Sequence, residues 1–411
     1  MTDHSPASPT LPDVLRTPGV PRYFASRVLV TFATQIVSVS IGWLIYDLTR
    51  NPLNLGLVGL VQFLPFPLLV FVTGVAADRY SRRRIMALCA AGGALCVTGL
   101  LSLTYTGVTA VWPIYALLTL FSVTRAFLAP AATSLLANLV TGPKFAPALA
   151  INSTAFQAAL ILGPMAGGLL YGVSAQAALG TAIVLLVTAT LLMLTIPAPA
   201  QHSRREPTTP AVLLAGARYV WTNKMVLGAT TLDLFAVLLG GATALLPVYA
   251  RDILDAGPLG LGLLRAGPGV GAILMGLLLA SRPLRSHAGL WMFGGVAMFG
   301  LATTLFGLST QPWLSVAAMV VLGASDMISI NVRATLVQLA TPDELRGRVT
   351  AVNQVFISTS NELGEFRAGT MASLIGAVPA VVLGGIATLG VAGLWAALFP
   401  DLRRAQRLDG R

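Results

Sequence analysis

The stretch GVAADRYSRRR, from Gly74 to Arg84, lies between two long apolar segments and decides the fold class. It places four arginines and one aspartate within a few residues of each other. The apolar segments on either side reach the length of about 20 residues that a helix needs to span a bilayer. Arginines concentrated in so short a loop indicate that the loop faces the cytoplasm. The stretch therefore predicts both insertion into a membrane and the orientation of the neighbouring helices.

The composition extends this prediction to the whole chain. Of its 411 residues, 55% are hydrophobic and 10% are charged, whereas a soluble domain carries roughly 25% charged residues. A membrane β-barrel would alternate apolar and polar residues in segments of about ten, but the apolar runs here are continuous and longer. We therefore expect an all-α membrane protein.

Twelve apolar runs can each form a transmembrane helix, with ends defined to within a few residues. They lie near residues 24–47, 53–77, 85–106, 112–139, 147–171, 177–197, 225–249, 258–281, 288–308, 313–340, 349–373 and 377–399. The basic residues outside these runs gather in the two tails and the even-numbered loops, and only Arg50 and Arg251 fall in odd-numbered loops. This distribution predicts a multi-pass protein of the cytoplasmic (inner) membrane with both termini in the cytoplasm. The net charge of +11 then faces lipid head groups, and we expect no nucleic-acid binding.

A polar segment divides the chain into two halves that resemble each other. We expect a disordered cytoplasmic tail at 1–21, an N-terminal six-helix bundle at 22–197, a cytoplasmic linker at 198–224, a C-terminal six-helix bundle at 225–400 and a cytoplasmic tail at 401–411. An offset of 201 residues superposes Asn152 on Asn353, Gly163 on Gly364, Gly168 on Gly369 and Arg125 on Asp326. An offset of 206 residues superposes PLNLGL at 52–57 on PLGLGL at 258–263. Repeated halves of this kind are typical of secondary transporters, whose substrate site lies between the halves near the bilayer midplane.

The arginine-rich stretch resembles the loop between helices 2 and 3 of the major facilitator superfamily. In that family an aspartate in this loop pairs with basic groups and a neighbouring helix N-terminus, and so latches the outward-facing state. The resemblance implies a conformational latch formed by Gly74, Asp78, Arg79, Arg82, Arg83 and Arg84. Ser81 stands where the family usually has a glycine. The alternative is a plain cytoplasmic anchor, although anchoring alone does not need an aspartate.

A second motif, ALILGPMAGG at 159–168, is similar to the glycine- and proline-containing helix 5 motif of antiporter branches of the same superfamily. Ala159 replaces the leading glycine of that motif. The matching residues are Gly163, Pro164, Gly167 and Gly168. The glycines would let a neighbouring helix approach closely and the proline would kink the helix. The motif favours an exporter, and generic packing of small residues is the alternative.

Two further stretches carry charge inside predicted helices. Arg125, in RAFLAP, resembles the helix 4 arginine that the family uses for proton or substrate coupling. NELGEFRAG, at 361–369, places three charged residues in the eleventh apolar run. Together with TPDELRGR and LPVYARD, its wording resembles the enterobactin-exporter-like branch of the superfamily.

Charged residues at membrane depth are costly and usually face a cavity or a partner. The candidate proton carriers are, in order of preference, Glu365, Glu362, Asp233 and Asp326. The candidate charge partners or substrate anchors are Arg125, Arg333 and Arg367. Burial favours a neutral carboxyl group and a nearby arginine favours an ionised one, so alternation between the two would couple proton entry to substrate exit. Permanent structural ion pairs are the alternative for each acid.

Other polar residues in the apolar runs are assigned to helix faces, the membrane interface, the outer vestibule or the cavity. Asp326 and Arg333 are seven residues apart and are expected to share a helix face. Arg265 is expected to extend to the membrane interface, Trp43 to belong to the interfacial aromatic belt, and Asp47 to cap or line the outer vestibule. The cavity candidates are Gln35, Asn152, Gln157, Asn353 and Asn361.

The sequence predicts a transporter and not an enzyme. It has no G-x-x-x-x-G-K-[ST] loop for ATP and no H-E-x-x-H motif for zinc, and we expect no cofactor and no metal site. The leading hypothesis is a secondary active transporter that exports a small organic molecule, such as a siderophore, drug or metabolite, in exchange for protons by alternating access. A single chain would suffice, because the site lies between its own halves. An importer or facilitator on the same fold, and a non-transporting membrane receptor or scaffold, are the alternatives.

Overall fold

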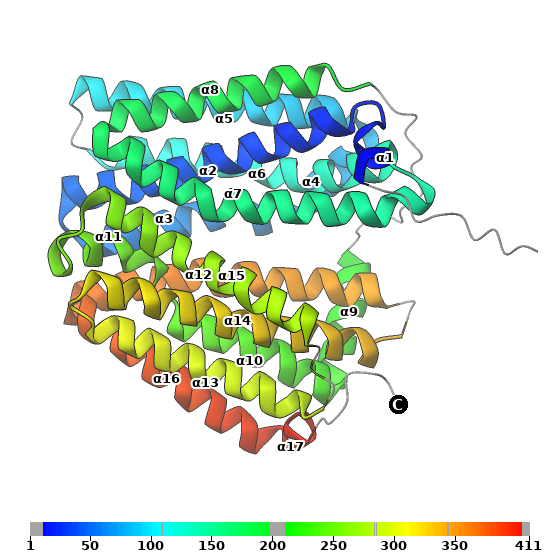
Figure 1. The fold of residues 1–411 in the computed structure, drawn as a ribbon, viewed down its shortest axis with the longest axis vertical. Helices are drawn as coiled ribbons and strands as arrows, with labels where there is room; N and C mark the ends of the chain where they lie inside the picture. The colour runs from blue at the N-terminus through cyan, green and yellow to red at the C-terminus, as the bar shows by residue number, and fades with distance from the viewer. Residues whose placement is uncertain are drawn as a thin grey trace, which may run out of the picture.

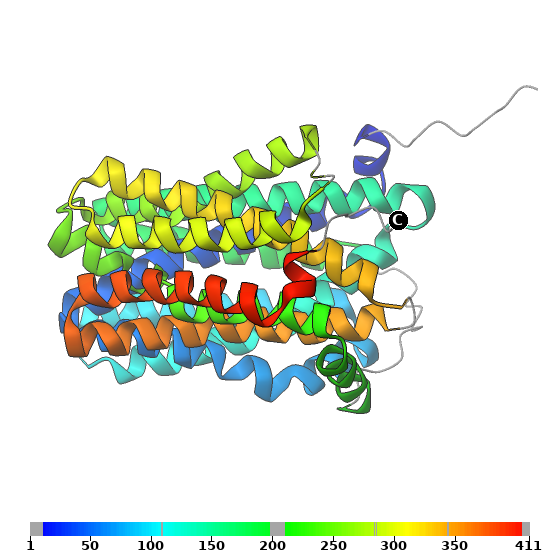
Figure 2. The same ribbon diagram turned by 90° about the horizontal axis from the view of Figure 1, so that it is seen from below.

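A computed structural model describes residues 11–107, 110–197, 210–282, 284, 286–342 and 345–404. The regular elements in these ranges are helices, which confirms the predicted all-α class. They form two bundles lying side by side (Figure 1). The helices of both bundles run in nearly the same direction, as the view from below also shows (Figure 2). The chain therefore consists of two helical halves.

The first half contains seven long helices and one short one before them. They are α1 (Leu11–Leu15), α2 (Val20–Thr49), α3 (Pro52–Phe63), α4 (Pro65–Arg79), α5 (Arg82–Thr106), α6 (Trp112–Leu139), α7 (Phe145–Val173, preceded by the 3-10 turn η1, Gly142–Lys144) and α8 (Ala175–Leu194). The predicted span at 53–77 is broken into α3 and α4, because Pro65 has no N–H to continue the helix. Arg82, Arg83 and Arg84 form the first turn of α5 and not a loop.

The second half has the same order of helices. They are α9 (Pro210–Thr222), α10 (Lys224–Gly240), the 3-10 turn η2 (Thr243–Leu245), α11 (Leu246–Val248), the π-helical turn η3 (Tyr249–Ile253), α12 (Gly257–Ser281), α13 (Ala288–Leu308), α14 (Pro312–Ala340), α15 (Arg346–Ile375), α16 (Ala377–Leu398) and α17 (Pro400–Arg403). The predicted span at 225–249 is also broken, since α10 ends at Gly240 and short turns continue it to Ile253.

Local sequence signals explain several helix ends. The side chain of Asn51 accepts a hydrogen bond from the N–H of Leu53 at the start of α3, and Ser174 caps α8 in the same way. Asn223 accepts from two N–H groups at the start of α10. Each cap satisfies donors that have no partner within the helix. Gly376, with φ of +91°, permits the sharp reversal between α15 and α16.

Eleven segments in the described part of the chain are long and apolar enough to cross a membrane. The remaining predicted span, 349–373, corresponds to α15, which lies among the other helices of its half (Figure 1). This helix carries Glu362, Glu365 and Arg367, and so it is the most polar of the long helices. With α15 included, the described part of the chain contains a helical segment for each of the twelve expected spans.

The segments expected to be tails and linker contain helices. Within the predicted tail at 1–21, α1 is helical and α2 already begins at Val20. Within the predicted linker at 198–224, α9 is helical and packs on α15. Residues 1–10, 198–209 and 405–411 lie outside the described residues.

The two halves are joined at one end of the molecule. The ends of the described chain, α1 and α17, lie at the same end, here called the terminal end (Figure 1). At the opposite end, here called the closed end, one apolar core runs from the first half across to Leu246 and Phe306 of the second. A separate apolar core, around Met292 and Leu336, fills the terminal end of the second half alone. The two cores show that the halves share an interior only toward the closed end.

Two helix pairs, here called seams, form most of the contact between the halves. In the α3–α15 seam, a Cβ atom on Gly56 would lie 2.9 Å from the carbonyl oxygen of Phe366. In the α7–α12 seam, a Cβ atom on Gly168 would lie 2.5 Å from the carbonyl oxygen of Pro258. Glycines let the backbones approach this closely. The offsets found in the sequence relate Gly56 to Gly262 and Gly168 to Gly369, so the seams are equivalent contacts of the two halves.

Candidate functional site

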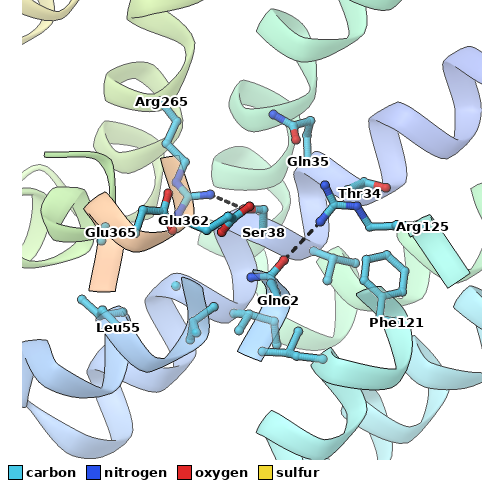
Figure 3. Close-up of a pocket in the computed structure, with 16 residues that line it drawn as sticks. Thr34, Gln35, Ser38, Leu55, Gln62, Phe121, Arg125, Arg265, Glu362 and Glu365 are labelled. Atoms are coloured by element: carbon cyan, nitrogen blue, oxygen red, sulfur yellow. Dashed lines mark hydrogen bonds between the residues drawn. The ribbon is translucent and has the colours of Figure 1, made fainter. Parts of the chain in front are cut away.

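A cavity of about 130 Å³ lies between the halves, next to both seams. The first half lines it with α2, α3 and α6, and the second half lines it with α12, α15 and the turn η2 (Figure 3). Most of its polar lining consists of Thr34, Gln35, Ser38, Gln62, Arg125, Arg265, Glu362 and Glu365. The cavity thus combines two arginines and two glutamates with neutral hydrogen-bonding groups.

Arg125 enters the cavity from α6, as predicted from its position at membrane depth. Its Nη1 donates a hydrogen bond to Oε1 of Gln62, at 3.2 Å. Its guanidinium carbon lies 6.0 Å from the centre of the Phe66 ring. Figure 3 shows the side chain directed toward the middle of the cavity. A neutral amide and an aromatic ring position this cation and leave its charge uncompensated by an adjacent carboxylate.

Glu362 and Glu365 lie one helical turn apart on α15, and both line the cavity (Figure 3). Glu365 packs against Gly59 of α3, where a Cβ atom would lie 2.9 Å from Cβ of Glu365. None of the ion pairs within 4.0 Å in the described part of the chain includes either glutamate, Arg125 or Arg265. The two acids therefore face the cavity without a direct cationic partner.

Arg265 also belongs to the cavity, and its expected extension to the interface is wrong. Its Nη1 donates a hydrogen bond to Oγ of Ser38 on α2, and its Nε is buried without a partner. A Cβ atom on Gly42 would lie 3.4 Å from its Nη2, so the glycine makes room for the guanidinium. Depth along α12 did not reveal that the side chain points inward.

Asp233, Asp326 and Arg333 form a separate cluster inside the second half. Arg333 makes a buried ion pair with Asp233 of α10, whereas the sequence had related it only to Asp326 on its own helix. A space of about 10 Å³ between α10, α13 and α14 is lined by both aspartates. The cluster lies away from the residues that line the central cavity. Within the described residues, no group of His, Cys, Asp or Glu side chains is arranged to hold a metal ion.

The other predicted site residues divide between the cavity and the helix packing. Gln35 lines the cavity, whereas Asn152, Gln157, Asn353 and Asn361 are not among its lining residues. Arg367 lies 3.2 Å from the sulfur of Met371, through its Nη1, and next to Gly384 of α16. It packs within the second half and is not among the lining residues either.

The helix 5 motif joins α7 to two neighbours. A Cβ atom on Gly163 would lie 2.7 Å from Cβ of Gln35, and one on Gly167 would lie 3.0 Å from Cα of Ile36 on α2. Gly168 and the carbonyl oxygen of Pro164 face Gly262 on α12 in the other half. The motif therefore packs α7 against its own half and forms the second seam.

The predicted latch lies at the terminal end, where α4 ends and α5 begins. Nη1 of Arg83 donates a 2.6 Å hydrogen bond to the carbonyl oxygen of Ile196, beyond α8. Arg82 is buried, while Arg79 and Arg84 are exposed, and a Cβ atom on Gly74 would meet open space. The side chain of Asp78 lies outside the described residues.

A network of charged and polar side chains joins the halves at the closed end. Asp47 pairs with Arg251, and Asp252 pairs with Arg50 and accepts a hydrogen bond from Tyr46. The guanidinium of Arg251 lies over the ring of Trp43, at 5.4 Å from its centre. Trp43 is 9% exposed, so its assignment to an interfacial belt is wrong.

The cavity between two equivalent helical halves, closed at one end, defines the class of a membrane transporter that works between its halves. The family described as Major Facilitator Superfamily matches residues 23–365. The chain therefore belongs to the major facilitator superfamily, as the sequence motifs indicated.

Named relatives cover nearly the whole chain. An uncharacterized MFS-type transporter, YvqJ of Bacillus subtilis, is 26% identical over 400 residues, covering 94% of this chain and 93% of the relative. The enterobactin exporter EntS of Escherichia coli O1:K1 is also 26% identical, covering 93% of this chain and 91% of the relative.

Solved structures of low identity share the fold. A bacterial homolog of the human lysosomal transporter Spinster, in an inward-facing and unoccupied conformation, superposes with a TM-score of 0.74 at 14% identity, covering 94% and 96% of the two chains. A bacterial homologue of the iron transporter ferroportin, in an inward-facing state, gives a TM-score of 0.70 at 14% identity, covering 96% and 100%.

Three lining residues were missed by the sequence reasoning besides Arg265. Thr34 and Ser38 flank the candidate Gln35 on α2, and Gln62 lies one helix away on α3. Their signal was weak, because single hydroxyl and amide groups are common in membrane helices. A search for polar residues within one turn of Gln35 would have found two of the three.

Proposed function

We propose that this transporter exports a small organic molecule, such as a siderophore, a drug or a secreted metabolite, in exchange for protons. The observation that carries the proposal is the pair Glu362 and Glu365, which line the central cavity from α15. Acids at membrane depth that face a cavity are the usual proton carriers of such proteins. The similarity to the enterobactin exporter EntS supports outward transport.

The orientation follows from the positive-inside distribution of basic residues. It puts the terminal end, with both chain termini, in the cytoplasm and the closed end outside the cytoplasmic membrane. The structure then corresponds to an inward-facing state. A single chain supplies both sides of the cavity, so we propose that it works as a monomer.

The size of the cavity bears on the substrate. Pockets for drug-sized ligands measure roughly 300–1,000 Å³, and the central cavity measures about 130 Å³. A substrate of that size requires the side chains and helices around the cavity to move apart from their positions here. The proposed cycle supplies such a movement, because the halves rock about the seams between the two states.

The test is substrate-induced proton release in everted vesicles, across a panel of chemically varied compounds. We expect one class of compound to dissipate the proton gradient with the unchanged protein and not with Glu365→Gln, because the amide cannot carry a proton. Asp255→Asn is the matched control, since it makes the same change at an exposed turn outside the cavity.

The same assay separates the alternatives. Equal proton release by the unchanged protein and Glu365→Gln would exclude Glu365 as the sole proton carrier and leave Glu362 and Asp233 as the candidates. Uptake of a compound together with protons, or flux without protons, would establish an importer or a facilitator. Flux of no compound, together with tight co-purification of another protein, would favour a receptor or scaffold.

A further inference from the structure

Arg265 links the two halves by a polar contact at the edge of the central cavity. It belongs to α12 of the second half, and its guanidinium donates to Ser38 on α2 of the first half. The contact lies beside the α7–α12 seam, where Gly262, one turn earlier on α12, meets Pro164 of α7. Separation of the halves at the closed end would therefore break this hydrogen bond.

A second partner for Arg265 lies in the same cavity. Glu365 lines the cavity from α15, which belongs to the same half as α12 (Figure 3). Nε of Arg265 is buried without a partner, so the guanidinium has a donor to offer. A carboxylate binds a guanidinium more strongly than a neutral hydroxyl does. Ionisation of Glu365 would therefore draw Arg265 away from Ser38.

Few charged groups compete for this exchange. Those lining the cavity around Glu365 are Arg265 from α12, Arg125 from α6 and Glu362 from α15 itself. The turn η2 and helices α2 and α3 contribute uncharged lining residues. Arg125 already donates to Gln62. Arg265 is thus the cation whose present partner belongs to the opposite half.

We propose that Arg265 exchanges partners with the protonation of Glu365, and so connects proton binding to the closed end. With Glu365 neutral, Arg265 bonds Ser38 across the halves and helps hold the closed end shut. With Glu365 ionised, Arg265 pairs with it inside the second half, and the halves lose one contact. The inference rests on the proposed function, for which it supplies a positioning residue.

The direction of the exchange agrees with proton-driven export. A proton that leaves Glu365 toward the cytoplasm weakens the closed end, and this permits the loaded carrier to open outward. A proton that binds Glu365 from outside frees Arg265 to bond Ser38 again, and the empty carrier returns to the inward-facing state. The proton is conserved in each step, and the exchange of hydrogen-bond partners needs no other reactant.

The experiment measures the distance across the closed end without any substrate. Spin labels are placed on Trp112→Cys at the start of α6 and Leu374→Cys at the end of α15, both exposed positions in opposite halves. Cys89 and Cys96, the native cysteines, are replaced by alanine. Short label distances report a shut closed end, and long ones an open closed end, in lipid nanodiscs at acidic and alkaline pH.

Each variant has a distinct expected result. Ser38→Ala raises the ratio of open to shut molecules about tenfold at acidic pH, the size expected for a hydrogen bond to a charged group, and leaves it unchanged at alkaline pH. Glu365→Gln stays shut at both pH values. Arg265→Gln loses the dependence on pH, while Arg265→Lys retains it. Elution of each variant as the unchanged monodisperse peak confirms folding.

Two results would overturn the inference. The first is an unchanged distance distribution in Ser38→Ala at acidic pH. The second is a pH response in Arg265→Gln equal to that of the unchanged protein. Because no substrate is present, the expected distances with no transport of any compound would support the partner exchange and count against the exporter. Proton-coupled transport of a compound, together with either of the two overturning results, would support the exporter and count against the partner exchange.

Discussion

The two seams between the halves share one backbone arrangement but differ in charge. The offset of 206 residues relates Gly59 of α3 to Arg265 of α12, and the offset of 201 relates Pro164 of α7 to Glu365 of α15. In the α3–α15 seam a glycine therefore packs against an acid. The equivalent positions of the α7–α12 seam hold a proline and a base. Both charges belong to the second half. The repeat supplies the mechanical contact twice, whereas the ionisable groups next to it were placed on one side only.

The largest effect on the ratio of open to shut molecules is expected from replacing a glycine in each seam by a larger residue. Gly168→Val and Gly369→Val each force a side chain into backbone of the other half, where a Cβ atom would lie 2.5 Å and 2.6 Å from the nearest atom. Overpacking costs about 1–3 kcal/mol, so either variant should shift the equilibrium roughly 5- to 150-fold toward an open closed end. The label distance between positions 112 and 374 measures the shift.

The comparison between the two variants tests the equivalence of the seams. Shifts that agree within about threefold would support equal mechanical roles, since such a difference is below 1 kcal/mol. A large shift in one variant alone would show that one seam carries the contact. Gly172→Ala on α7 is the control, because a Cβ atom there meets nothing within 4 Å.

An intermediate effect, on proton release, is expected where Gly59 of the α3–α15 seam contacts Glu365. Gly59→Ala places a methyl group 2.9 Å from Cβ and 3.1 Å from Oε2 of Glu365. The carboxyl group must move by a few tenths of an ångström, and we expect substrate-driven proton release to fall severalfold without loss of expression. Proton release in everted vesicles is the measurement. An activity equal to that of the Gly172→Ala control would mean that the position of Glu365 is not critical.

The smallest effect is expected from the network at the closed end. Asp47→Asn removes the pair with Arg251, whose side chains are 46% and 24% exposed, and also the 3.8 Å pair with Arg50. Arg251→Gln removes only the first of these pairs. Partly exposed pairs contribute about 0.2–1 kcal/mol, so each variant should shift the label distances less than about fivefold. The exchanged pair, Asp47→Arg with Arg251→Asp, should restore the original distribution. A double variant more open than either single one would contradict a simple pair.

The fold was predictable because each membrane helix needs a long apolar run. The repeat offsets also matched the glycines that the structure places in the seams, although the sequence did not show that these glycines lie between the halves. The breaks after Phe63 and Gly240 were not predicted. A continuous helix and an interrupted one can have the same apolar sequence. Pro65 lies among other apolar residues, so the break before it was not recognised.

The charge of a residue and its depth in an apolar run were enough to predict some of the site residues. They were not enough where the direction of the side chain decides its position. Arg125, Glu362 and Glu365 line the cavity, as expected of charges deep in apolar runs. Arg265 was misplaced because its long side chain can reach the interface or the interior from the same backbone position. The ion pair of Arg333 with Asp233 was not predicted, because spacing along one helix says nothing about an acid that α10 brings from another part of the chain.

The depth of Glu365 would make an exporter of the proposed kind sensitive to membrane voltage. The residue lies ten positions before the end of α15, roughly 15 Å along the helix axis. A charge that crosses the whole membrane gains or loses about 2.3 kcal/mol per 100 mV. In an exporter of the proposed kind, a proton arriving from outside crosses part of that field before it binds. A cell with a negative interior would therefore load Glu365 even where the two solutions have equal pH.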